Sequence, residues 1–322
     1  MRIARKLIKR KNIDTVKNTE IFVKKSETVI KGFNDLKSDN FVEKKSSKTR
    51  EEKLESQIDV ASCSYIGRLG NNFFQMAVTL EYGRKYNVPV IFDKWIYDGI
   101  EHDASLIFEK DLLFIKYPDD FEWNLYKDPF HYYKPVPYMK NIRFHGFFQS
   151  YKYFDEQITK DFFSPNLKHV VNVIYDKYSY IFSKRTTSIH CRRGDYLNNE
   201  NFYSLSMKYY NEAMQKMNSV TDLYVVFSDD IEWCKHNIIS KDKKEMLYIE
   251  NNPDYIDLFL MSMCDNNIIA NSSFSWWGAY LNRNPYKIVI TPNPKEWFTP
   301  KSPSYDKTFD LCPENWMIMD NT

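Results

Sequence analysis

Two adjacent arginines, Arg192 and Arg193, follow a short run of β-forming residues and precede Gly194 and Asp195. Neighbouring guanidinium groups repel each other unless an anion lies near them, and the fork of arginine N–H donors matches two phosphate oxygens. Gly194 permits a sharp turn, and Asp195 can hold one arginine in place. Ligands of parallel α/β sheets bind beyond the carboxyl ends of the strands. We therefore interpret this turn as a diphosphate clamp, with a surface cluster of salt bridges as the alternative.

Hydroxyl and imidazole groups also follow predicted strands. Ser272, Ser273 and Ser275 stand where a helix begins, and free N–H groups at a helix N-terminus bind anions. Ordinary N-capping is the alternative, and we favour it for these serines taken alone. His190 is placed to bind a phosphate or a ribose, and a hydrogen-bonded histidine at the end of a strand is the alternative.

Three acidic residues have two interpretations each. Asp257 lies in the first turn of a predicted helix with apolar neighbours, where a carboxylate can accept the ring N–H and the exocyclic amine of guanine. Favourable placement in the helix dipole explains Asp257 as well. Asp229 and Asp230 could hold a divalent metal with a diphosphate, but we favour capping of the next helix.

Strands and helices alternate along the chain. The residues at 203, 207, 210, 214 and 217 form one apolar stripe of helical spacing. An asparagine N-cap after the glycine turn at 67–72 opens the first helix. Strands are predicted at 63–66, 88–92, 142–148, 186–190, 223–227, 246–249, 268–270 and 287–291, and helices at 73–86, from about 153, at about 203–217, at 254–264 and from 276. This alternation predicts a parallel, Rossmann-like sheet.

Charge is distributed unevenly over the 322 residues, a length that suggests two domains. Residues 1–55 carry a net charge of +7 and the remainder carries −5. We interpret residues 1–57 as a basic, weakly ordered or helical extension. Residues 1–11 combine six basic side chains with Ile3, Leu7 and Ile8. They predict either a helix on an anionic membrane surface or, as we favour, a solvated terminus.

Five scattered cysteines without a CxxC pair fit neither a disulfide framework nor a zinc site. No apolar run approaches the roughly 20 residues of a membrane span, and the basic start has no apolar segment typical of a secretory signal. We expect a cytoplasmic protein, with peripheral membrane contact through residues 1–11 as the refinement.

Five motifs, taken in order, resemble the α-1,2-fucosyltransferases of glycosyltransferase family 11. They are GRLGNN at 67–72, HGFFQSYKYF at 145–154, IHCRRGDY at 189–196, FSDDIEW at 227–233 and DLFLMSMCDNNIIANSSFSWWGA at 257–279. The HxRRxD pattern is shared with α-1,6- and protein O-fucosyltransferases, whereas the NSSFSWWGA block is more specific. The resemblance runs from about residue 65 to residue 298 and leaves the basic extension outside.

The resemblance implies a GT-B architecture, in which two Rossmann-like domains face a central cleft. We expect an acceptor-side domain at 58–180 and a donor-binding domain at 181–322. It also implies inverting transfer of L-fucose from GDP-β-L-fucose, without a metal or other cofactor, to the 2-hydroxyl of a galactose-containing glycan during surface-glycan synthesis. Other fucosyl linkages or a protein acceptor remain open. A non-enzymatic protein that binds nucleic acid or membrane through the basic extension is the other alternative, and we expect no nucleic-acid partner.

Roles follow residue by residue from the same resemblance. Arg192 corresponds to the arginine that binds the β-phosphate, Asp257 to the guanine-reading aspartate, and Ser272, Ser273 and Phe274 to the turn around the nucleotide.

His190, Arg193 and Asp195 belong to the HxRRxD pattern, while Gly70 and Asn71 correspond to a pair that approaches the donor. Asn72 departs from the family's usual glutamine and has a shorter reach. Asp195, Glu200 or no residue at all is the catalytic base.

Overall fold

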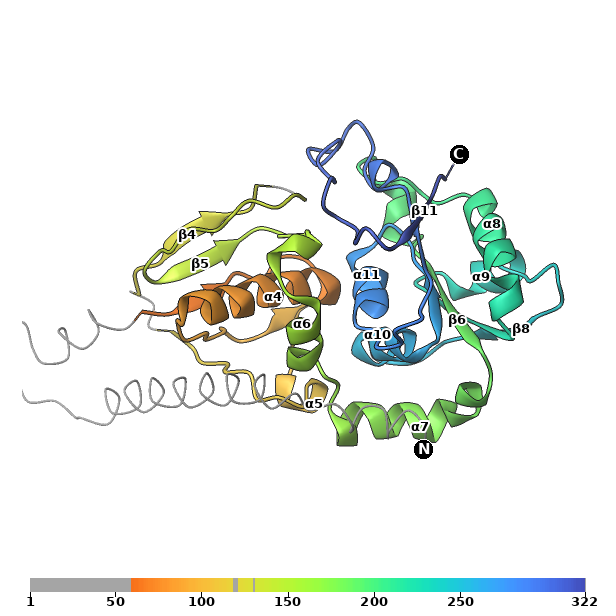
Figure 1. Ribbon diagram of the computed structural model, residues 1–322, viewed down its shortest axis with the longest axis horizontal. Helices are drawn as coiled ribbons and strands as arrows, with labels where there is room; N and C mark the ends of the chain where they lie inside the picture. The colour runs from red at the N-terminus through yellow and green to blue at the C-terminus, as the bar shows by residue number, and fades with distance from the viewer. Residues whose placement is uncertain (1–58, 118–120, 130, 322) are drawn as a thin grey trace, which may run out of the picture.

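The computed structural model describes residues 59–117, 121–129 and 131–321. The predictions for residues 1–57, including membrane contact by residues 1–11, lie outside these ranges. Figure 1 shows two sheets with helices α4 (Leu69–Tyr86) and α11 (Ser273–Tyr280) packed together between them. Within the described residues, no helix combines the length and the apolar character needed to cross a membrane.

The larger sheet has six parallel strands in the order β11-β10-β9-β6-β7-β8. Their bounds are β6 Thr186–Cys191, β7 Leu223–Ser228, β8 Glu245–Tyr248, β9 Asn266–Ile268, β10 Val289–Pro292 and β11 Met317–Met319. Along the chain, β6, β7 and β8 follow one another toward one edge of the sheet, and β9, β10 and β11 then follow one another toward the opposite edge. This is the strand order of doubly wound dinucleotide-binding sheets. The direction reverses between β6 and β9, where such sheets bind ligands.

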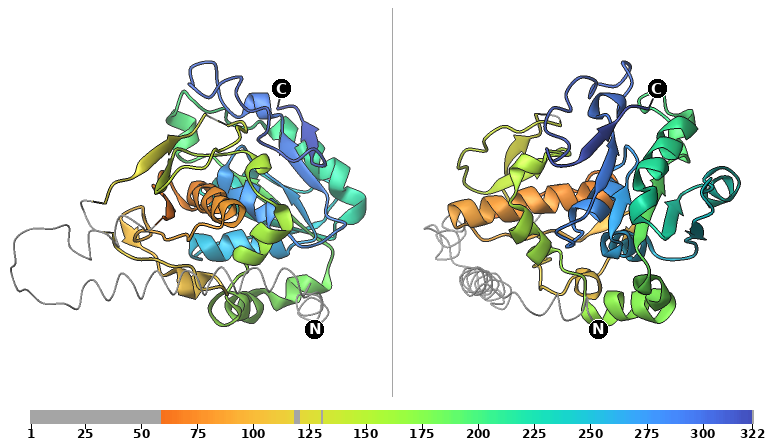
Figure 2. Two further views of the ribbon diagram at one scale, coloured as in Figure 1. Left: turned by 60° about the vertical axis from the view of Figure 1, so that its left-hand side comes forward. Right: turned by 45° about the vertical axis from the view of Figure 1, so that its right-hand side comes forward.

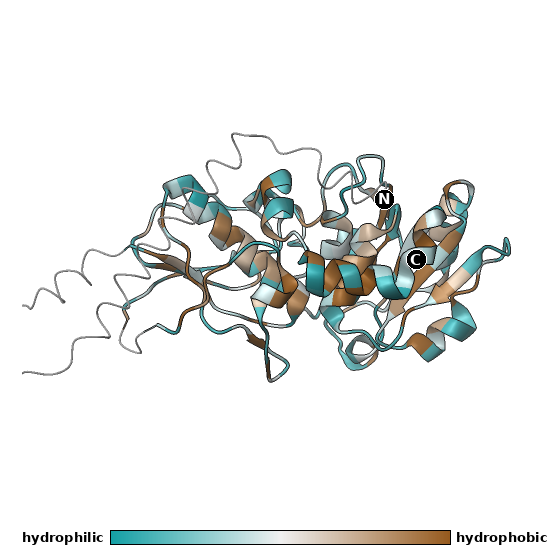
Figure 3. Ribbon diagram, turned by 90° about the horizontal axis from the view of Figure 1, so that it is seen from below, coloured by the Kyte–Doolittle hydropathy of each residue, from teal (hydrophilic) through white to brown (hydrophobic). Residues whose placement is uncertain are grey.

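Alternating side chains of this sheet are buried on its two faces. Figure 3 colours the ribbon by hydropathy and shows hydrophobic residues along its strands and helices. Tyr224 and Val226 belong to a core with α8 and α9, whereas Val225 and Phe227 belong to a core with α10 and α11. The two-residue period of a strand produces this division. The helices are α8 Met207–Met217, α9 Ile231–Asn237 and α10 Asp254–Met263.

The smaller sheet has three parallel strands in the order β1-β5-β4, namely β1 Ala61–Cys63, β5 Ile142–His145 and β4 Asn124–Lys127. The strand predicted at 88–92 is reduced to isolated bridges at Val90 and Phe92. Pro89 has no N–H to donate to a ladder, which explains the interruption. A hairpin of β2 (Ile96–Tyr97) and β3 (Ile100–Glu101) follows.

Shorter elements connect the two sheets, and Figure 2 shows them from two further sides. They are η1 Tyr151–Tyr153, α6 Glu156–Phe162, η2 Leu167–Val171, α7 Asn172–Tyr178 and η3 Ser179–Ser183, between β5 and β6. The other short helices are α5 Ala104–Ile107, between β3 and β4, and η4 Asp195–Asn198, η5 Asn218–Val220 and η6 Pro294–Glu296 in the second half of the chain.

One hydrophobic core joins the two halves of the chain. Phe74 of α4 contacts Trp276 and Trp277 of α11, with ring centroids 4.5 and 4.9 Å apart. The two sheets fall on either side of residue 180 in the sequence. The domain boundary at 180/181 and the central cleft stay predictions.

Several local predictions were wrong in detail. Helix α4 starts at Leu69, so Asn71 and Asn72 lie inside it, and its N-cap is Arg68, whose side chain makes no capping hydrogen bond. Helix α8 begins at Met207 and leaves Tyr203 outside. The edge strand β11 was missed because it lies in a proline-rich tail and its residues Met317 and Ile318 are exposed.

Candidate functional site

The turns that follow β6, β7 and β9 lie at one edge of the larger sheet because these strands are parallel. The first contains residues 192–195, the second residues 229–230 and the third residues 271–273. The sheet therefore brings together three of the four polar turns that the sequence singled out.

Two carboxylates hold the Arg192 guanidinium. Its Nη2 donates to Asp195 Oδ1 at 2.6 Å, and its Nη1 lies 3.0 Å from Asp229 Oδ2. The guanidinium also lies over the Tyr196 ring, 5.4 Å from its centroid. The side chain of Arg192 is only 17% exposed, yet a guanidinium has further N–H donors beyond the two used here. Arg192 is thus fixed in position and still able to bind an anion.

Arg193 has a different set of partners. Its Nε donates to Asp230 Oδ2 at 3.1 Å, its backbone N–H donates to Asp229 Oδ1 at 2.9 Å, and its guanidinium lies 3.6 Å from the centroid of the Trp233 ring. These contacts tie the turn to α9. Anion binding by Arg193 stays a prediction.

The aspartates after β7 serve this turn. Asp230 caps α9 by accepting from Trp233 N, as the sequence suggested. The contacts of Asp229 and Asp230 with the arginines were missed, because they depend on the pairing of β6 with β7. A Cβ at Gly194 would lie 2.4 Å from Asp229 Oδ2, so close approach of this carboxylate requires glycine.

His190 connects β6 to the turn after β9. Its Nδ1 shares a hydrogen bond of 2.8 Å with Ser275 Oγ, and its ring centroid lies 5.4 Å from that of Phe274. Burial, together with the nearby Arg192, lowers the pKa of His190 to about 3. The imidazole is therefore neutral at physiological pH and adds no positive charge to the site.

The N-termini of α4 and α11 meet beside this turn. Ser272 caps α11 by accepting from Phe274 N at 3.4 Å. Ser273 Oγ donates to Asn71 Oδ1 at 2.8 Å. A Cβ at Gly70 would lie 2.6 Å from Phe274 N, so the two helix ends approach closely only because residue 70 is glycine.

Gln149 completes the contact between the halves. Its Nε2 donates to Asn71 Oδ1 at 2.7 Å, the same oxygen that accepts from Ser273. Both lone pairs of this oxygen are thus occupied, while Asn71 Nδ2 has no acceptor among the described residues. The sequence marked Gln149 only as part of the HGFFQ motif, without a role.

Asn72 is fully buried and has a structural role. Its Oδ1 accepts from Trp95 Nε1 at 2.9 Å, and its Nδ2 donates to Ile66 O and to Gln75 Oε1, at 3.3 Å each. The shorter amide at this position is thus used inside the smaller half of the molecule.

Asp257 lies in the first turn of α10, which packs against α11. Asn252 Nδ2 donates to Asp257 Oδ1 at 2.8 Å. Burial is the main cause that raises the pKa of Asp257 to about 7. No contact of the described residues joins Asp257 to the arginine turn.

The two candidate bases are both largely exposed. The side chain of Asp195 is 56% exposed and binds Arg192. Glu200 is 74% exposed and pairs with Lys301 at 2.7 Å. Among the described residues, no cluster of three or more His, Cys, Asp or Glu side chains is arranged to hold a metal.

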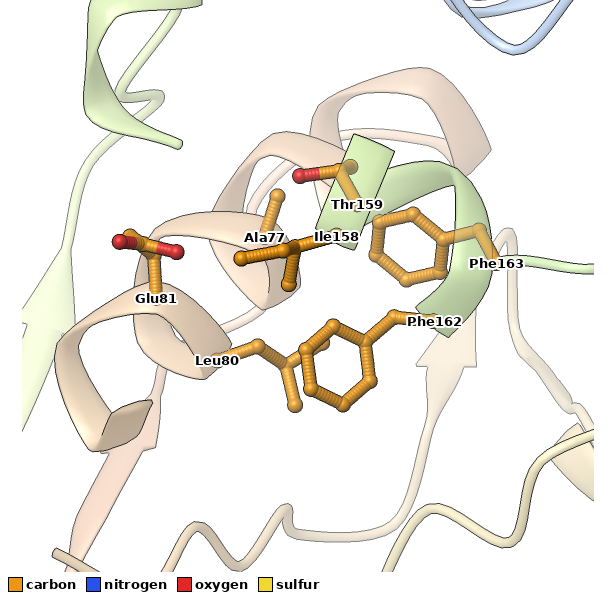
Figure 4. Close-up of a pocket in the computed structure, with 7 residues that line it drawn as sticks. All are labelled: Ala77, Leu80, Glu81, Ile158, Thr159, Phe162 and Phe163. Atoms are coloured by element: carbon orange, nitrogen blue, oxygen red, sulfur yellow. The ribbon is translucent and has the colours of Figure 1, made fainter. Parts of the chain in front are cut away.

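A small, mainly apolar pocket lies away from these residues, between α4 and α6 (Figure 4). It is lined by Ala77, Leu80, Glu81, Ile158, Thr159, Phe162 and Phe163. None of the predicted site residues lines it.

The sequence model of glycosyl transferase family 11 matches residues 107–311, more than half of the chain. This chain belongs to glycosyl transferase family 11. Four of the five motifs lie within the matched residues, including the arginine turn and the turn that opens α11. The family-11 assignment confirms the resemblance stated from the sequence.

Among its relatives, the chain is 36% identical to the alpha-1,2-colitosyltransferase of Escherichia coli over 193 residues, which are 55% of this chain and 62% of that protein. It is 43% identical over 123 residues to the O-antigen biosynthesis glycosyltransferase WbnK of Escherichia coli, covering 35% of this chain and 39% of that protein. The galactoside alpha-(1,2)-fucosyltransferase 1 of Leontocebus fuscicollis is 29% identical over 102 residues, 29% of this chain and 28% of that protein. The chain thus matches less than two thirds of each relative's length.

Solved structures share the fold of this family-11 chain. A mutant of Arabidopsis thaliana FUT1 in complex with GDP has a TM-score of 0.53, covering 87% of this chain and 78% of that one at 11% identity. POFUT1 in complex with GDP-fucose has a TM-score of 0.50, covering 71% and 95% at 12% identity. The α/β fold with parallel sheets is thus similar to that of fucosyltransferases of GT-B type.

Proposed function

We propose that this protein transfers L-fucose from GDP-β-L-fucose to the 2-hydroxyl of a galactoside in surface-glycan synthesis, with inversion at the anomeric carbon. The observation that carries the proposal is that Arg192 follows β6 and the N-terminus of α11 follows β9, the two strands between which the strand order reverses, and that the His190–Ser275 hydrogen bond joins β6 to α11. Membership of family 11 and the names of the three relatives support the reaction class.

The donor's diphosphate would lie between Arg192 and the first turn of α11. Arg192 supplies N–H donors and a positive charge, and the α11 N-terminus supplies backbone N–H groups. Asn71 Nδ2 is a further donor that approaches from the smaller half. Guanine would bind at Asp257, on the neighbouring helix α10, which accounts for the absence of contacts between Asp257 and the arginine turn.

In this reaction the bond between the fucose anomeric carbon and the phosphate oxygen breaks, while a bond to the acceptor oxygen forms. The transition state resembles an oxocarbenium ion, and negative charge grows on the departing diphosphate. Fixed donors that already point at that charge are usually the largest catalytic contribution. The carboxylates of Asp195 and Asp229 hold Arg192 in place before the donor arrives, so we propose a mechanism without a metal.

The geometry favours a positioning role for Asp195. Inversion requires the acceptor to attack on the side opposite the leaving phosphate. Asp195 binds the arginine that we assign to that phosphate, so it lies on the leaving-group side. Glu200 is paired with Lys301 on the surface. The acceptor's proton therefore leaves to a group on the acceptor side or to water.

Colitose transfer is the second candidate, because a relative that is 36% identical over 193 residues is an alpha-1,2-colitosyltransferase. Colitose is L-fucose without its 3-hydroxyl group, so the two donors share the GDP moiety and differ only at that hydroxyl. In this proposal Arg192 and α11 bind the diphosphate, which both donors share, so they do not distinguish fucose from colitose.

Cytoplasmic location with membrane contact through residues 1–11 belongs to the same proposal and concerns residues outside the described ranges.

Turnover with paired donors tests the proposal. GDP-L-fucose and GDP-colitose are supplied separately with a panel of galactosides, and release of GDP is compared with and without acceptor. We expect acceptor-dependent release with GDP-L-fucose. Turnover of GDP-colitose alone would transfer the proposal to colitose, and absence of turnover with either donor on any galactoside would contradict it.

A further inference from the structure

Asn252 occupies a bridging position between α7 and α10. Lys177 Nζ donates to Asn252 Oδ1 at 2.8 Å. On the other side of the amide, Asn252 Nδ2 donates to Tyr178 Oη and to Asp257 Oδ1, at 2.8 Å each. Lys177 and Tyr178 are the last two residues of α7, and Asn252 precedes the first turn of α10.

The chemistry of these partners determines which way the amide faces. A lysine ammonium only donates, so the amide oxygen must lie toward Lys177. The NH₂ group must then lie toward Asp257, whose carboxylate only accepts when it is ionised. A flipped amide would place NH₂ against the ammonium and a carbonyl oxygen against the carboxylate, which is unfavourable at both ends.

One carboxylate oxygen of Asp257 is thereby held. Asp257 Oδ1 accepts from Asn252. Oδ2 has no hydrogen-bond partner within the described part of the chain, and it is not completely buried. A hydrogen bond to one oxygen of a carboxylate limits rotation of the group and leaves the remaining lone pairs for a ligand.

We propose that Asn252 is a positioning residue for guanine recognition, and that Lys177 and Tyr178 of α7 orient Asn252 in turn. This inference rests on the proposed function. Guanine presents its ring N–H and its exocyclic amine side by side, and a carboxylate in a fixed orientation accepts from both. Selectivity for the base would thus be controlled from α7, a helix of the segment between the two sheets.

The charges around Asp257 fit this role. Asp254, on the same helix, raises the pKa of Asp257, while Asn252 and Lys177 lower it against the larger effect of burial. Asp254 itself accepts from Tyr97 Oη of the β2–β3 hairpin at 3.0 Å. Burial raises the pKa of Asp254, His102 lowers it and Asp98 raises it further. Removing the Asn252 donor or the Lys177 cation should therefore make ionisation of Asp257 harder.

Calorimetry on the full chain tests the inference with GDP, IDP and ADP between pH 6 and pH 8.5. IDP lacks the exocyclic amine, so the ratio of IDP to GDP dissociation constants measures the paired contact. We expect Asn252→Ala to reduce this ratio about tenfold, because the carboxylate loses the hydrogen bond that fixes its orientation. The pH at which GDP binding is half-maximal should move to higher values, because Asp257 loses a donor that favours its ionised form. Lys177→Met should have a smaller effect in the same direction, and Lys177→Arg should restore the wild-type ratio. Lys168→Met, on an exposed lysine, is the matched control and should change neither quantity.

Two outcomes would overturn the inference alone. Asn252→Ala with the wild-type ratio and midpoint would show that Asp257 needs no orienting partner. Equal weakening of GDP, IDP and ADP with a lower melting temperature would give Asn252 only a role in stability. Wild-type protein without any preference for GDP over ADP would instead contradict the proposed function, and the inference with it.

Discussion

Arg192 illustrates how neighbouring residues prepare a single side chain. A guanidinium held by Asp195 and Asp229 loses little conformational entropy when an anion binds, because its rotamer is already restricted. The carboxylates also compete with the anion for the same charge. The exposed Asp195 is the weaker competitor, since exposed ion pairs contribute only about 0–1 kcal/mol.

Arg192→Lys should therefore reduce fucose transfer by roughly 100-fold or more while the protein remains folded. An ammonium is a point charge without the planar fork that lets a guanidinium bind two phosphate oxygens while it keeps its carboxylate partners. Steady-state turnover with GDP-fucose measures the loss. Arg185→Lys is the matched control, because Arg185 pairs with Asp222 on the surface, and should retain activity. Near-normal turnover of Arg192→Lys would contradict the phosphate-binding role.

Asp257→Asn should stabilise the free protein while weakening its nucleotide selectivity. The pKa of Asp257 is raised to about 7, so burial of its charge lowers stability as pH rises from the ordinary carboxyl pKa toward 7. The neutral amide removes this cost, and one pKa unit corresponds to about 1.4 kcal/mol. We expect a gain on the order of 2 kcal/mol in urea unfolding at pH 8 and a smaller gain at pH 5. Equal stability of the two proteins at pH 8 would show that the carboxylate is well solvated.

At the scale of elements, the site depends on the close approach of two helix N-termini. Gly70 and the hydrogen bond between Asn71 and Ser273 bring α4 to α11. Their positive dipole ends point to the same region, which adds to the attraction for an anion. The helices further along share the aromatic core of Phe74 and Trp276.

Gly70→Ala should destabilise this junction. The new Cβ would lie 2.6 Å from Phe274 N and from the carbonyl carbon of Ser273, and backbone atoms cannot rotate away. Overpacking costs about 1–3 kcal/mol, which exceeds the gain of up to about 1 kcal/mol from helix propensity. Chemical unfolding and turnover should both report the loss.

Ser273→Ala is the matched comparison for this variant. It removes the hydrogen bond to Asn71 without adding volume, so its destabilisation should be near 1 kcal/mol and smaller than that of Gly70→Ala. A Gly70→Ala protein with wild-type stability and activity would show that the helix ends can separate freely.

The elements that the sequence predicted best are those whose patterns are local. Strands β6 and β7 are continuous buried β-forming runs, and Ser272 caps α11 as the alternative interpretation of the serines had it. The helix itself begins at Ser273, three residues before the predicted start at 276. Predictions from the β propensity of single residues were wrong where tertiary contacts determine the structure. Examples are the interrupted strand around Pro89 and the exposed edge strand β11.

The candidate site was predictable in part for the same reason. Arg192, Asp195, Ser273 and Asn71 stand in recognisable turns, and the structure places them in two connected clusters. The other contacts join residues that are far apart in the sequence. Asp229 lies 37 residues from its partner Arg192, and Gln149 lies 78 residues from Asn71. Asn252 lies 75 residues from Lys177. Local patterns contain no information about such contacts.

At the scale of the whole molecule, the proposed mechanism neutralises the leaving diphosphate with protein groups alone. Asp229 and Asp230 each bind an arginine, which leaves them poorly suited to hold a divalent cation. Transfer should therefore continue in excess EDTA at a rate within about twofold of the untreated enzyme, since fixed donors already neutralise the growing charge. Loss of activity that Mg²⁺ or Mn²⁺ restores would require a metal in the reaction.

The central claim is tested most directly by the structure of the product. GDP-β-L-fucose and a galactoside acceptor are incubated with the full chain, and the isolated product is examined by NMR for the anomeric configuration and the linked carbon. The account predicts α-L-fucose on the galactose 2-oxygen, hence inversion at the anomeric carbon. A β-linked fucose, or fucose on any other hydroxyl of the acceptor, would contradict it.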